Sequence, residues 1–415
     1  MEAHQRSRLQ RAMIELVATD GFEALTVRSL TKRARVSSGT FYSHFRGTDD
    51  CLLSSFDLLC QRAAERFLEG GQDEPEPQRR LALAIDRLLQ DTAASPQAAT
   101  FMLRAAPAAG PAFTGRLRNS TMRLGVALEL CLRSGDGPQL PPLLLEGIVA
   151  GLLQAGRVYL AADGEEETGG VAAEVADWIV SLSLSAQDAG LLRAAVSPER
   201  NGRTPAPGPQ DWSWGEVPGD ERAMISAAAF RIAKEGGYHQ LTIPRICREA
   251  GIPRRRFDRH FSGTDDCFVS ALEAQVTTVL AALPSNQPRA RWSAAVYRKL
   301  GALCGAIEAD PDSARVVLVE TSAAGTAGID SHDRQISQIA QVLRGGAPEA
   351  QKPTHVAAEA STAAALAILR RRASEKSSAA TAHLLPLLAL LALAPAIGAP
   401  AVLRAMGHER AGREN

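Results

Sequence analysis

A long tandem repeat limits the architectures that this chain can adopt. The segment 21–51 aligns without a gap to the segment 237–267, which lies 216 residues further along the chain. The run GTDDC at 47–51 recurs unchanged at 263–267. Self-similarity at a fixed period is the signature of one structural unit built more than once. The sequence therefore predicts two copies of the same unit.

The similarity continues more faintly beyond the aligned segment. In the stretches LLEGIVAGLLQAGR (144–157) and AAEASTAAALAILR (357–370), Glu146 of the first copy corresponds to Glu359 of the second. Each half is thus a complete copy. Residues 197–219, between the copies, are rich in Pro and Gly, which predicts a linker.

The composition favours helices. Aromatic residues make up only 5% of the chain, while Ala and Leu, both strong helix formers, are abundant. The formal net charge is zero, which argues against a protein that coats nucleic acid non-specifically but leaves room for local basic patches. We expect an all-α globular protein.

The six cysteines give no sign of a zinc site or a disulfide framework, because they form no CxxC pair and no short Cys/His cluster. Dispersed thiols of this kind are typical of a reducing cytoplasm. The polar N-terminal segment 1–11 carries no secretory signal. We expect a cytoplasmic protein that binds no metal and no cofactor.

One apolar stretch, 384–403, has about 20 residues without a charge and is long enough to be weighed as a membrane span. Its Pro386, Pro395, Gly398 and Pro400 would break a lone helix and leave backbone groups that lipid cannot satisfy. We therefore expect a buried pair of short helices and no membrane partner.

The first copy begins with an apolar stripe at helical spacing, formed by Leu9, Met13, Leu16 and Val17. Gly21 follows, and it is a natural helix stop because the left-handed conformation costs glycine nothing. These residues predict a first helix that ends just before this glycine.

A shorter helix and a tight turn come next. Thr26 is a candidate N-cap for a helix that carries Leu30 and Ala34 on one face. Residues 35–37 form the predicted turn, and Ser37 is a candidate cap for the following helix.

The following helix is predicted to bury Phe41 and Phe45, which lie four residues apart and so face the same side. Two short helices joined by a tight turn, the second exposing polar residues between buried aromatics, make the helix-turn-helix pattern. Residues 26–46 contain no acid, which suits a phosphate backbone. Their basic residues are Arg28, Lys32, Arg33, Arg35 and Arg46.

The second copy keeps this frame but changes the exposed face. Its segment 253–261 reads PRRRFDRHF, with four arginines. These arginines would either donate paired hydrogen bonds to guanine edges or bind phosphates. The alternative for either copy is a small three-helix core with a solvated basic face.

These residues resemble the TetR/AcrR family of regulators. The motif is the run Gly-Phe…Leu-Thr-Val…Ala…Val-Ser…Thr-Phe-Tyr-x-His-Phe of residues 21–45, followed by a helix that begins near Thr48. The resemblance covers nearly all of both halves, more weakly in their C-terminal parts. It implies an all-α fold of two tandem modules, each a three-helix DNA-binding unit followed by a helical effector and dimerisation domain. In the second half, 384–400 resembles the terminal helix pair with which family members dimerise.

The resemblance and the linker together divide the chain into five expected segments. They are a first helix-turn-helix domain at 1–50, a first effector and dimerisation domain at 51–196, the linker at 197–219, a second helix-turn-helix domain at 220–266, and a second effector and dimerisation domain at 267–415.

The resemblance also implies which residues contact DNA. The start of the second helix would meet phosphates, and the third helix would enter the major groove. In the first copy the implied contacts are Thr26, Arg28, Ser38, Gly39, Thr40, Tyr42, Ser43 and His44. In the second copy they are Thr242, Arg245, Arg254, Arg255, Arg256, Arg259 and His260.

Two features depart from the family's pattern. Many members have a lysine at the head of the fourth helix, where this chain has Thr48 and Thr264. Asp258 stands where the first copy has Tyr42, which would bring a carboxylate near the DNA backbone. The second unit is therefore expected either to bind DNA weakly or to serve only as a partner for the first.

The leading hypothesis is a ligand-responsive transcriptional repressor at the bacterial nucleoid. It would bind double-stranded DNA and release it when a small molecule enters an effector domain. The effector is expected to be apolar, because such pockets are mostly apolar. The alternative is a ligand-binding or scaffolding protein without specific DNA affinity. An enzyme has no support, because no Walker, Rossmann or nucleophile-elbow motif is present.

The two halves are expected to pair within one chain as a pseudo-dimer. A flexible linker of the length of 197–219 would have a reach on the order of 25–30 Å and would hold the partner at millimolar effective concentration. Covalently joined heads are also free to recognise unlike half-sites. The opposing possibility is a homodimer, in which 384–400 pairs with its copy in a second chain.

Overall fold

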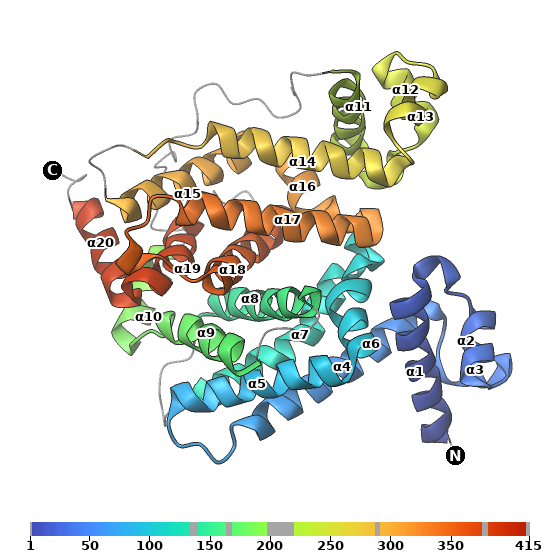
Figure 1. The fold of residues 1–415 in the computed structure, drawn as a ribbon, viewed down its shortest axis with the longest axis horizontal. Helices are drawn as coiled ribbons and strands as arrows, with labels where there is room; N and C mark the ends of the chain where they lie inside the picture. The colour runs from blue at the N-terminus through green and yellow to red at the C-terminus, as the bar shows by residue number, and fades with distance from the viewer. Residues whose placement is uncertain are drawn as a thin grey trace. The chain divides into compact units, whose positions relative to one another are not determined.

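The computed structural model describes residues 2–132, 140–162, 168–196, 220–286, 291–375 and 381–411. These residues form helices and turns without a β-strand (Figure 1), which confirms the all-α fold. The expected linker at 197–219 lies outside the described residues.

The helices of the first copy run from α1 to α10. They are α1 (Glu2–Asp20), η1 (Phe22–Ala24), α2 (Val27–Ala34), α3 (Ser38–His44), α4 (Thr48–Gly70), α5 (Pro77–Ala94), α6 (Pro96–Thr100), the π-helix η2 (Phe101–Ala105), η3 (Ala106–Ala109), α7 (Pro111–Leu132), α8 (Pro142–Ala161), α9 (Thr168–Ser181) and α10 (Ala186–Val196).

The second copy repeats this order from α11 to α20. Its helices are α11 (Glu221–Gly236), η4 (Tyr238–Gln240), α12 (Ile243–Ala250), α13 (Arg254–His260), α14 (Thr264–Ala282), α15 (Trp292–Ala309), α16 (Pro311–Val319), η5 (Glu320–Ala324), α17 (Gly325–Arg344), η6 (Glu349–Gln351), α18 (His355–Ser374), η7 (Thr381–Leu384), α19 (Leu385–Ile397) and α20 (Ala399–Ala411).

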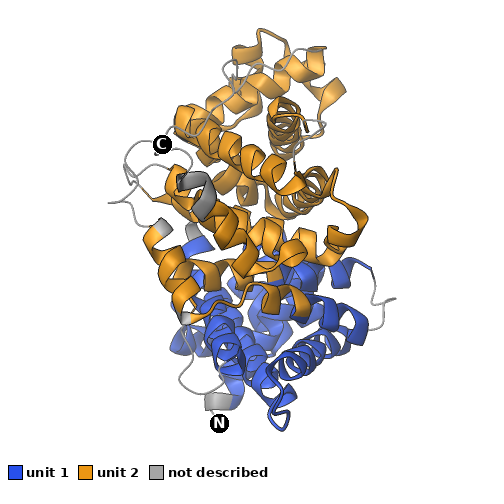
Figure 2. Cartoon of the chain, turned by 90° about the vertical axis from the view of Figure 1, so that its left-hand side faces the viewer, with its two compact units in different colours: residues 1–135, 152–176 blue, residues 136–151, 177–415 orange. Residues whose placement is uncertain are grey.

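The chain divides into two compact units (Figure 2). The first unit comprises residues 1–135 and 152–176, and the second comprises 136–151 and 177–415. This division does not follow the repeat. The start of α8, the end of α9 and all of α10 come from the first copy, yet they belong to the same unit as the second copy.

We call residues 1–50 the first head, in which α1, α2 and α3 contact one another (Figure 1). The predicted caps are confirmed. The Thr26 hydroxyl accepts a hydrogen bond from the Ser29 N–H, and the Ser37 hydroxyl accepts one from the Thr40 N–H, at 3.0 Å in each case. Arg35 occupies the turn between α2 and α3 in the left-handed conformation, with φ 52°.

The first head is held together by the side chains that the apolar pattern predicted. Leu9 and Met13 of α1, Leu30 of α2, Phe41 of α3 and Phe45, which follows α3, are all at least 98% buried. A helix as short as α3 is marginal in isolation, so burial of its two aromatic rings fixes its position. The same core extends into η2 through Phe101.

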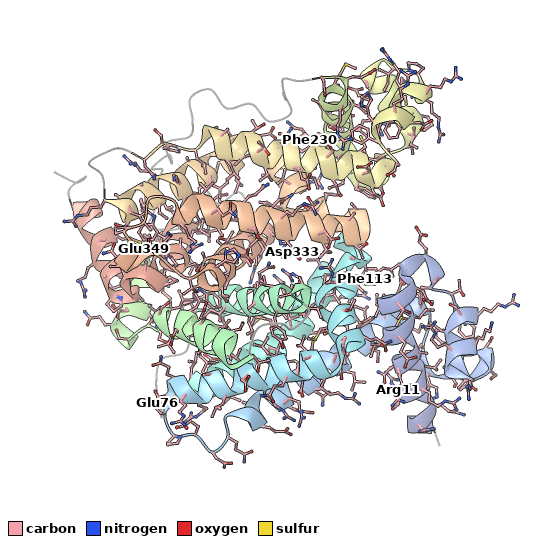
Figure 3. All side chains as sticks on the ribbon, viewed as in Figure 1. Arg11, Glu76, Phe113, Phe230, Asp333 and Glu349 are labelled. Carbon is pink, nitrogen blue, oxygen red and sulfur yellow. The ribbon has the colours of Figure 1, made fainter. Side chains whose placement is uncertain are left out.

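The second head, residues 220–266, has the same construction. Phe257 and Phe261 are buried like their counterparts, and Phe230 of α11 completes the core (Figure 3). At the turn where the first copy has Arg35, the second has Gly251, whose φ is 66°. Glycine adopts this left-handed conformation without the steric cost that a Cβ imposes.

The apolar stretch 384–403 forms α19 and the start of α20, as predicted for a buried helix pair. Gly398 separates the two helices with φ 78°. Pro395 lies inside α19, two residues before its end, where the missing N–H removes one hydrogen bond from a helix whose leucines are buried.

A different helix has the length and composition of a membrane span. Among the described residues it is α8, whose most apolar window is 61% buried inside the protein. Burial of this degree is typical of a core helix.

We expect Phe41→Ala to destabilise the first head by about 3–5 kcal/mol, because it removes a fully buried ring. The adjacent Tyr42→Ala, which truncates a side chain that is 61% exposed, serves as the control and should leave stability nearly unchanged. Denaturant unfolding followed by far-UV circular dichroism measures both. Equal losses in the two variants would contradict the assignment of α3's buried face.

Candidate nucleic-acid interface and effector cavity

The outer face of α3 carries the residues that were predicted to contact DNA. Ser38, Gly39, Tyr42 and Ser43 are exposed, whereas His44 is half-buried. Thr40 is also half-buried, and its hydroxyl lies 2.9 Å from the Ser37 hydroxyl. The structure therefore presents a small polar surface with a single large projecting side chain, Tyr42.

Basic side chains border this surface, but one of the five is already neutralised. Arg33 forms an ion pair with Asp20 at the end of α1, with a distance of 2.8 Å between Nη2 and Oδ2. Within the described part of the chain, the side chains of Arg28, Lys32, Arg35 and Arg46 form no ion pair. These four cations are available to phosphate oxygens. The acid that holds Arg33 lies outside the basic window 26–46, so the local pattern did not reveal it.

Some predicted contacts have hydroxyl or guanidinium groups that are engaged inside the protein. The Thr26 and Thr242 hydroxyls cap α2 and α12. The Arg245 guanidinium donates a 2.7 Å hydrogen bond to Gln240 and forms a 3.3 Å ion pair with Glu235. The DNA contacts of these three residues stay predictions, and each would require the side chain to share its donor or acceptor.

The second recognition helix, α13, has a strongly charged outer face. Arg254 forms an ion pair with Asp258 at 3.6 Å, and Arg256 forms one with Glu221 at 3.1 Å. His260 lies 3.2 Å from the same Glu221 carboxylate. Glu221 comes from the start of α11, so the fold brings to this face an acid that the motif itself does not contain.

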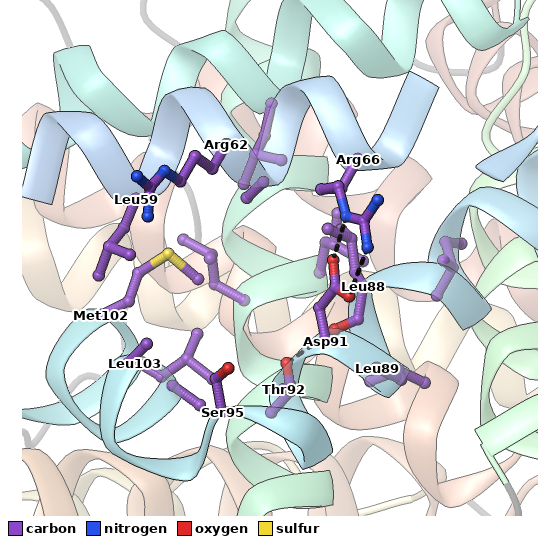
Figure 4. A pocket seen from close by; sticks show the side chains of 18 of the residues that line it. Leu59, Arg62, Arg66, Leu88, Leu89, Asp91, Thr92, Ser95, Met102 and Leu103 are labelled. Carbon is purple, nitrogen blue, oxygen red and sulfur yellow. Dashed lines mark hydrogen bonds and ion pairs between the residues drawn. The ribbon is translucent and has the colours of Figure 1, made fainter. Parts of the chain in front are cut away.

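A cavity of about 380 Å³ lies in the first unit, beyond the first head. Its wall is mostly apolar and includes Leu59 of α4, Leu88 and Leu89 of α5, and Met102 and Leu103 of η2 (Figure 4). Ligand pockets in proteins commonly have volumes of about 300–1,000 Å³, so this cavity is of ligand size.

Two arginines of α4 border the cavity (Figure 4). Arg66 is held by Asp91, with 3.1 Å between Nε and Oδ2, and by Glu69 at 3.0 Å. Arg62 is exposed and forms no ion pair within the described residues. Sequence analysis did not single out these residues. The spacing of Leu59, Arg62 and Arg66 on one helical face was the available signal, but the same spacing is common on solvated helices.

The corresponding space in the second copy is much smaller, at about 70 Å³. Lys299 of α15 is buried beside it, and its ammonium group lies 3.4 Å from the Val342 carbonyl oxygen. Burial lowers the pKa of Lys299. The two copies therefore differ in the volume that they offer to a ligand.

The cysteines are poor candidates for chemistry. Burial raises the pKa of Cys51, Cys60 and Cys267 to about 12, so these thiols stay protonated at neutral pH. Among the described residues, no three His, Cys, Asp or Glu side chains are grouped to hold a metal ion.

Comparisons with known proteins agree with this geometry. The family profile described as "Bacterial regulatory proteins, tetR family" matches residues 11–54 and again residues 225–271. A curated protein, the "Fatty acid metabolism regulator protein" of Bacillus subtilis (strain 168), is 30% identical over 76 residues, which are 18% of this chain and 39% of that protein. The chain thus matches less than half the length of that relative.

Solved structures with some similarity include two FadR regulators. FadR from Bacillus subtilis in complex with stearoyl-CoA is 18% identical with a TM-score of 0.37, over 42% of this chain and 97% of that one. The fatty acid degradation regulator FadR from Bacillus halodurans is 14% identical with a TM-score of 0.37, over 42% of this chain and 94% of that one.

We expect Tyr42→Ala and Arg28→Ala to weaken binding of the full chain to DNA from its own upstream region while leaving helicity intact. Loss of a phosphate contact by Arg28 should also make the salt dependence shallower by about one unit of slope. Gel shifts at two salt concentrations measure both effects. Arg33→Ala is the matched control and should change binding less, because Asp20 already holds this guanidinium. Wild-type affinity in both test variants would show that α2 and α3 do not form the DNA interface.

Proposed function

We propose, from the premise that the chain belongs to the TetR family of bacterial regulatory proteins and carries the family's DNA-binding unit twice, that it is a ligand-responsive transcriptional repressor. It acts on double-stranded DNA in the bacterial cytoplasm, at the nucleoid, and has no catalytic role. The observation that carries this proposal is the first head: a rigid aromatic core holds α3 with Tyr42 outward and four uncompensated cations around it.

The second candidate function is a ligand-binding or scaffolding protein without specific DNA affinity. The neutralised arginines of α13 favour it, because Asp258 and Glu221 offset half of that helix's arginine charge. A gel shift of the full chain separates the two functions. A scaffold would bind specific and unrelated DNA equally weakly, and added salt would abolish both complexes.

The proposed effector is an elongated apolar molecule with an anionic end. Its chain would fill the cavity of the first unit, and its charge would lie near Arg62, the cation at the rim that has no partner among the described residues. One effector binds per chain, because the corresponding space in the second copy is about 70 Å³.

The cavity wall and the first head's core share the elements α4, η2 and α7, which provides a route for the response. Met102 and Leu103 of η2 line the cavity, while Phe101 and Ala105 of the same π-helix belong to the head's core. A π-helix is a high-energy segment that often marks functional sites. A ligand that shifts η2 would therefore displace side chains against which the head is packed, and it would change DNA affinity only to the extent that it prefers the shifted state.

We expect dodecanoate, an apolar chain with a carboxylate, to bind the full chain with a stoichiometry of one and to weaken its DNA complex. Ala63→Phe places a ring in the cavity wall and should reduce dodecanoate affinity by about tenfold or more, because it removes ligand volume. Calorimetric titration measures affinity and stoichiometry. The control Gln61→Phe adds the same ring at an exposed position two residues away and should bind as wild type. Two ligands per chain, or equal binding by both variants, would contradict the site.

We further propose that the two copies pair within one chain. Support comes from the second compact unit, where helices of the first copy lie against helices of the second. The Trp178 indole N–H donates a 2.9 Å hydrogen bond to the Ser361 hydroxyl, and Arg371 forms a 2.6 Å ion pair with Glu146. In the same unit α10 contacts α19 and α20.

Small residues allow the start of α8 to approach α18 closely. A Cβ placed on Gly147 would lie 3.2 Å from the Ile368 Cδ1 and 3.4 Å from the Ala364 Cβ. One on Gly151 would lie within 3 Å of both the Trp178 ring and the Ala360 carbonyl oxygen. At both positions a Cβ would therefore meet α18, which leaves no room for larger side chains. A match of this kind favours pairing of these two unlike helices over pairing of either helix with its own copy.

We expect the full chain to have a mass near 44 kDa in solution at micromolar concentration. Internal pairing buries the apolar surfaces of these helices, so no second chain is required to cover them. Multi-angle light scattering over a tenfold dilution series measures the mass. A value near twice that, falling on dilution, would establish a homodimer and defeat the internal pairing.

A further inference from the structure

The two recognition helices present different chemistry at equivalent positions. The exposed residues of α3 include Gly39 and Ser43, whereas α13 has Arg255 and Arg259 at the corresponding places in the repeat. All four positions are exposed. The helices share their length and their buried aromatics, but the residue that precedes them is the capping Ser37 for α3 and Pro253 for α13.

Two of the four arginines of α13 are charge-compensated by nearby carboxylates. Arg254 pairs with Asp258 one turn further along the helix, and Arg256 pairs with Glu221 of α11. Exposed ion pairs of this kind are individually weak. They nevertheless reduce the attraction of these two arginines to DNA, because each carboxylate would approach the phosphates together with the arginine that it neutralises.

Arg255 and Arg259 are the remaining pair. In the described part of the chain neither side chain forms an ion pair or a hydrogen bond. They lie four residues apart and therefore project from the same face, about 6 Å apart along the helix axis. That spacing is close to two base-pair steps of about 3.4 Å.

We propose that Arg255 and Arg259 are the specificity-determining residues of the second head, and that they recognise guanines in one half of an asymmetric DNA site. Each guanidinium donates two parallel hydrogen bonds to O6 and N7 of a guanine in the major groove. The spacing of the two arginines corresponds to guanines about two base pairs apart. The first head has no cation at these positions and recognises the other half by different contacts. This proposal rests on the proposed function, because it requires that the full chain bind double-stranded DNA.

The test is selection of bound sequences from a random DNA pool by the full chain, followed by affinity measurements. The wild type should select a site with guanines in one half only. Arg255→Ala and Arg259→Ala should each lose the preference for one of these guanines, with affinity for the selected site falling roughly tenfold or more. Affinity for a site in which that guanine is already replaced should change much less.

A matched control comes from the same head but from outside the predicted contacts. Arg231→Ala removes a charge-compensated arginine of α11, which forms an ion pair with Glu249 at 2.9 Å, and should keep the guanine preference, with affinity changed by less than about threefold. Arg255→Lys keeps the charge but cannot donate two parallel hydrogen bonds in the fixed geometry of a guanidinium. This variant should keep the salt dependence of the wild type and weaken the guanine preference, because an ammonium group still donates to guanine O6 or N7 but without the fixed geometry.

The outcomes separate failure of this inference from failure of the proposed function. If the wild type selects no sequence and binds all DNA equally, the proposed function fails. If the wild type selects a site but the Arg255 and Arg259 variants select the same guanines, the inference alone is overturned. The inference is also overturned if these variants lose affinity equally for every sequence with a shallower salt dependence, because that result indicates phosphate contacts.

Discussion

Burial of two aromatic rings four residues apart on each recognition helix is the interaction on which both heads depend. The helices α3 and α13 are each only 7 residues long, too short to persist without tertiary contacts. Phe41 and Phe45, and likewise Phe257 and Phe261, lock these helices to the rest of their heads. Once the rings are fixed, helical geometry determines which residues face outward, and these outward residues are free to vary.

The same packing connects each head to the helices behind it. In the first copy the aromatic core continues into η2 through Phe101, and the neighbouring residues Met102 and Leu103 border the cavity. In the second copy the head's core includes Val316 and Val317 of α16, but the space beyond it is small. The construction that positions α3 and α13 is thus kept in both copies, whereas a cavity of ligand size is kept in one. A response to a ligand would begin at the first head.

Local sequence patterns predicted the parts of the fold that local chemistry controls. The caps Thr26 and Ser37 and the buried aromatics follow from side-chain type and spacing within a few residues, and they are confirmed. Contacts between segments that are distant in the sequence could not be predicted from these patterns. Glu221 meets Arg256 only because α11 packs beside α13, and the cavity exists because α4, α5, η2 and α8 fail to fill the space between them. Neither fact has a signature in the sequence near the residues concerned.

The contact between α8 and α18 joins residues that differ between the two copies. The sequence correspondence that matches Glu146 with Glu359 also matches Arg371 with Val158. Arg371 compensates the buried Glu146, whereas Glu359 is bonded within its own copy by Ser337 and His355. The Glu146–Arg371 ion pair is therefore not repeated by the equivalent residues of the two copies, because position 158 carries a valine. The contact joins unlike residues, and the outward faces of α3 and α13 and the volumes of the two cavities also differ between the copies.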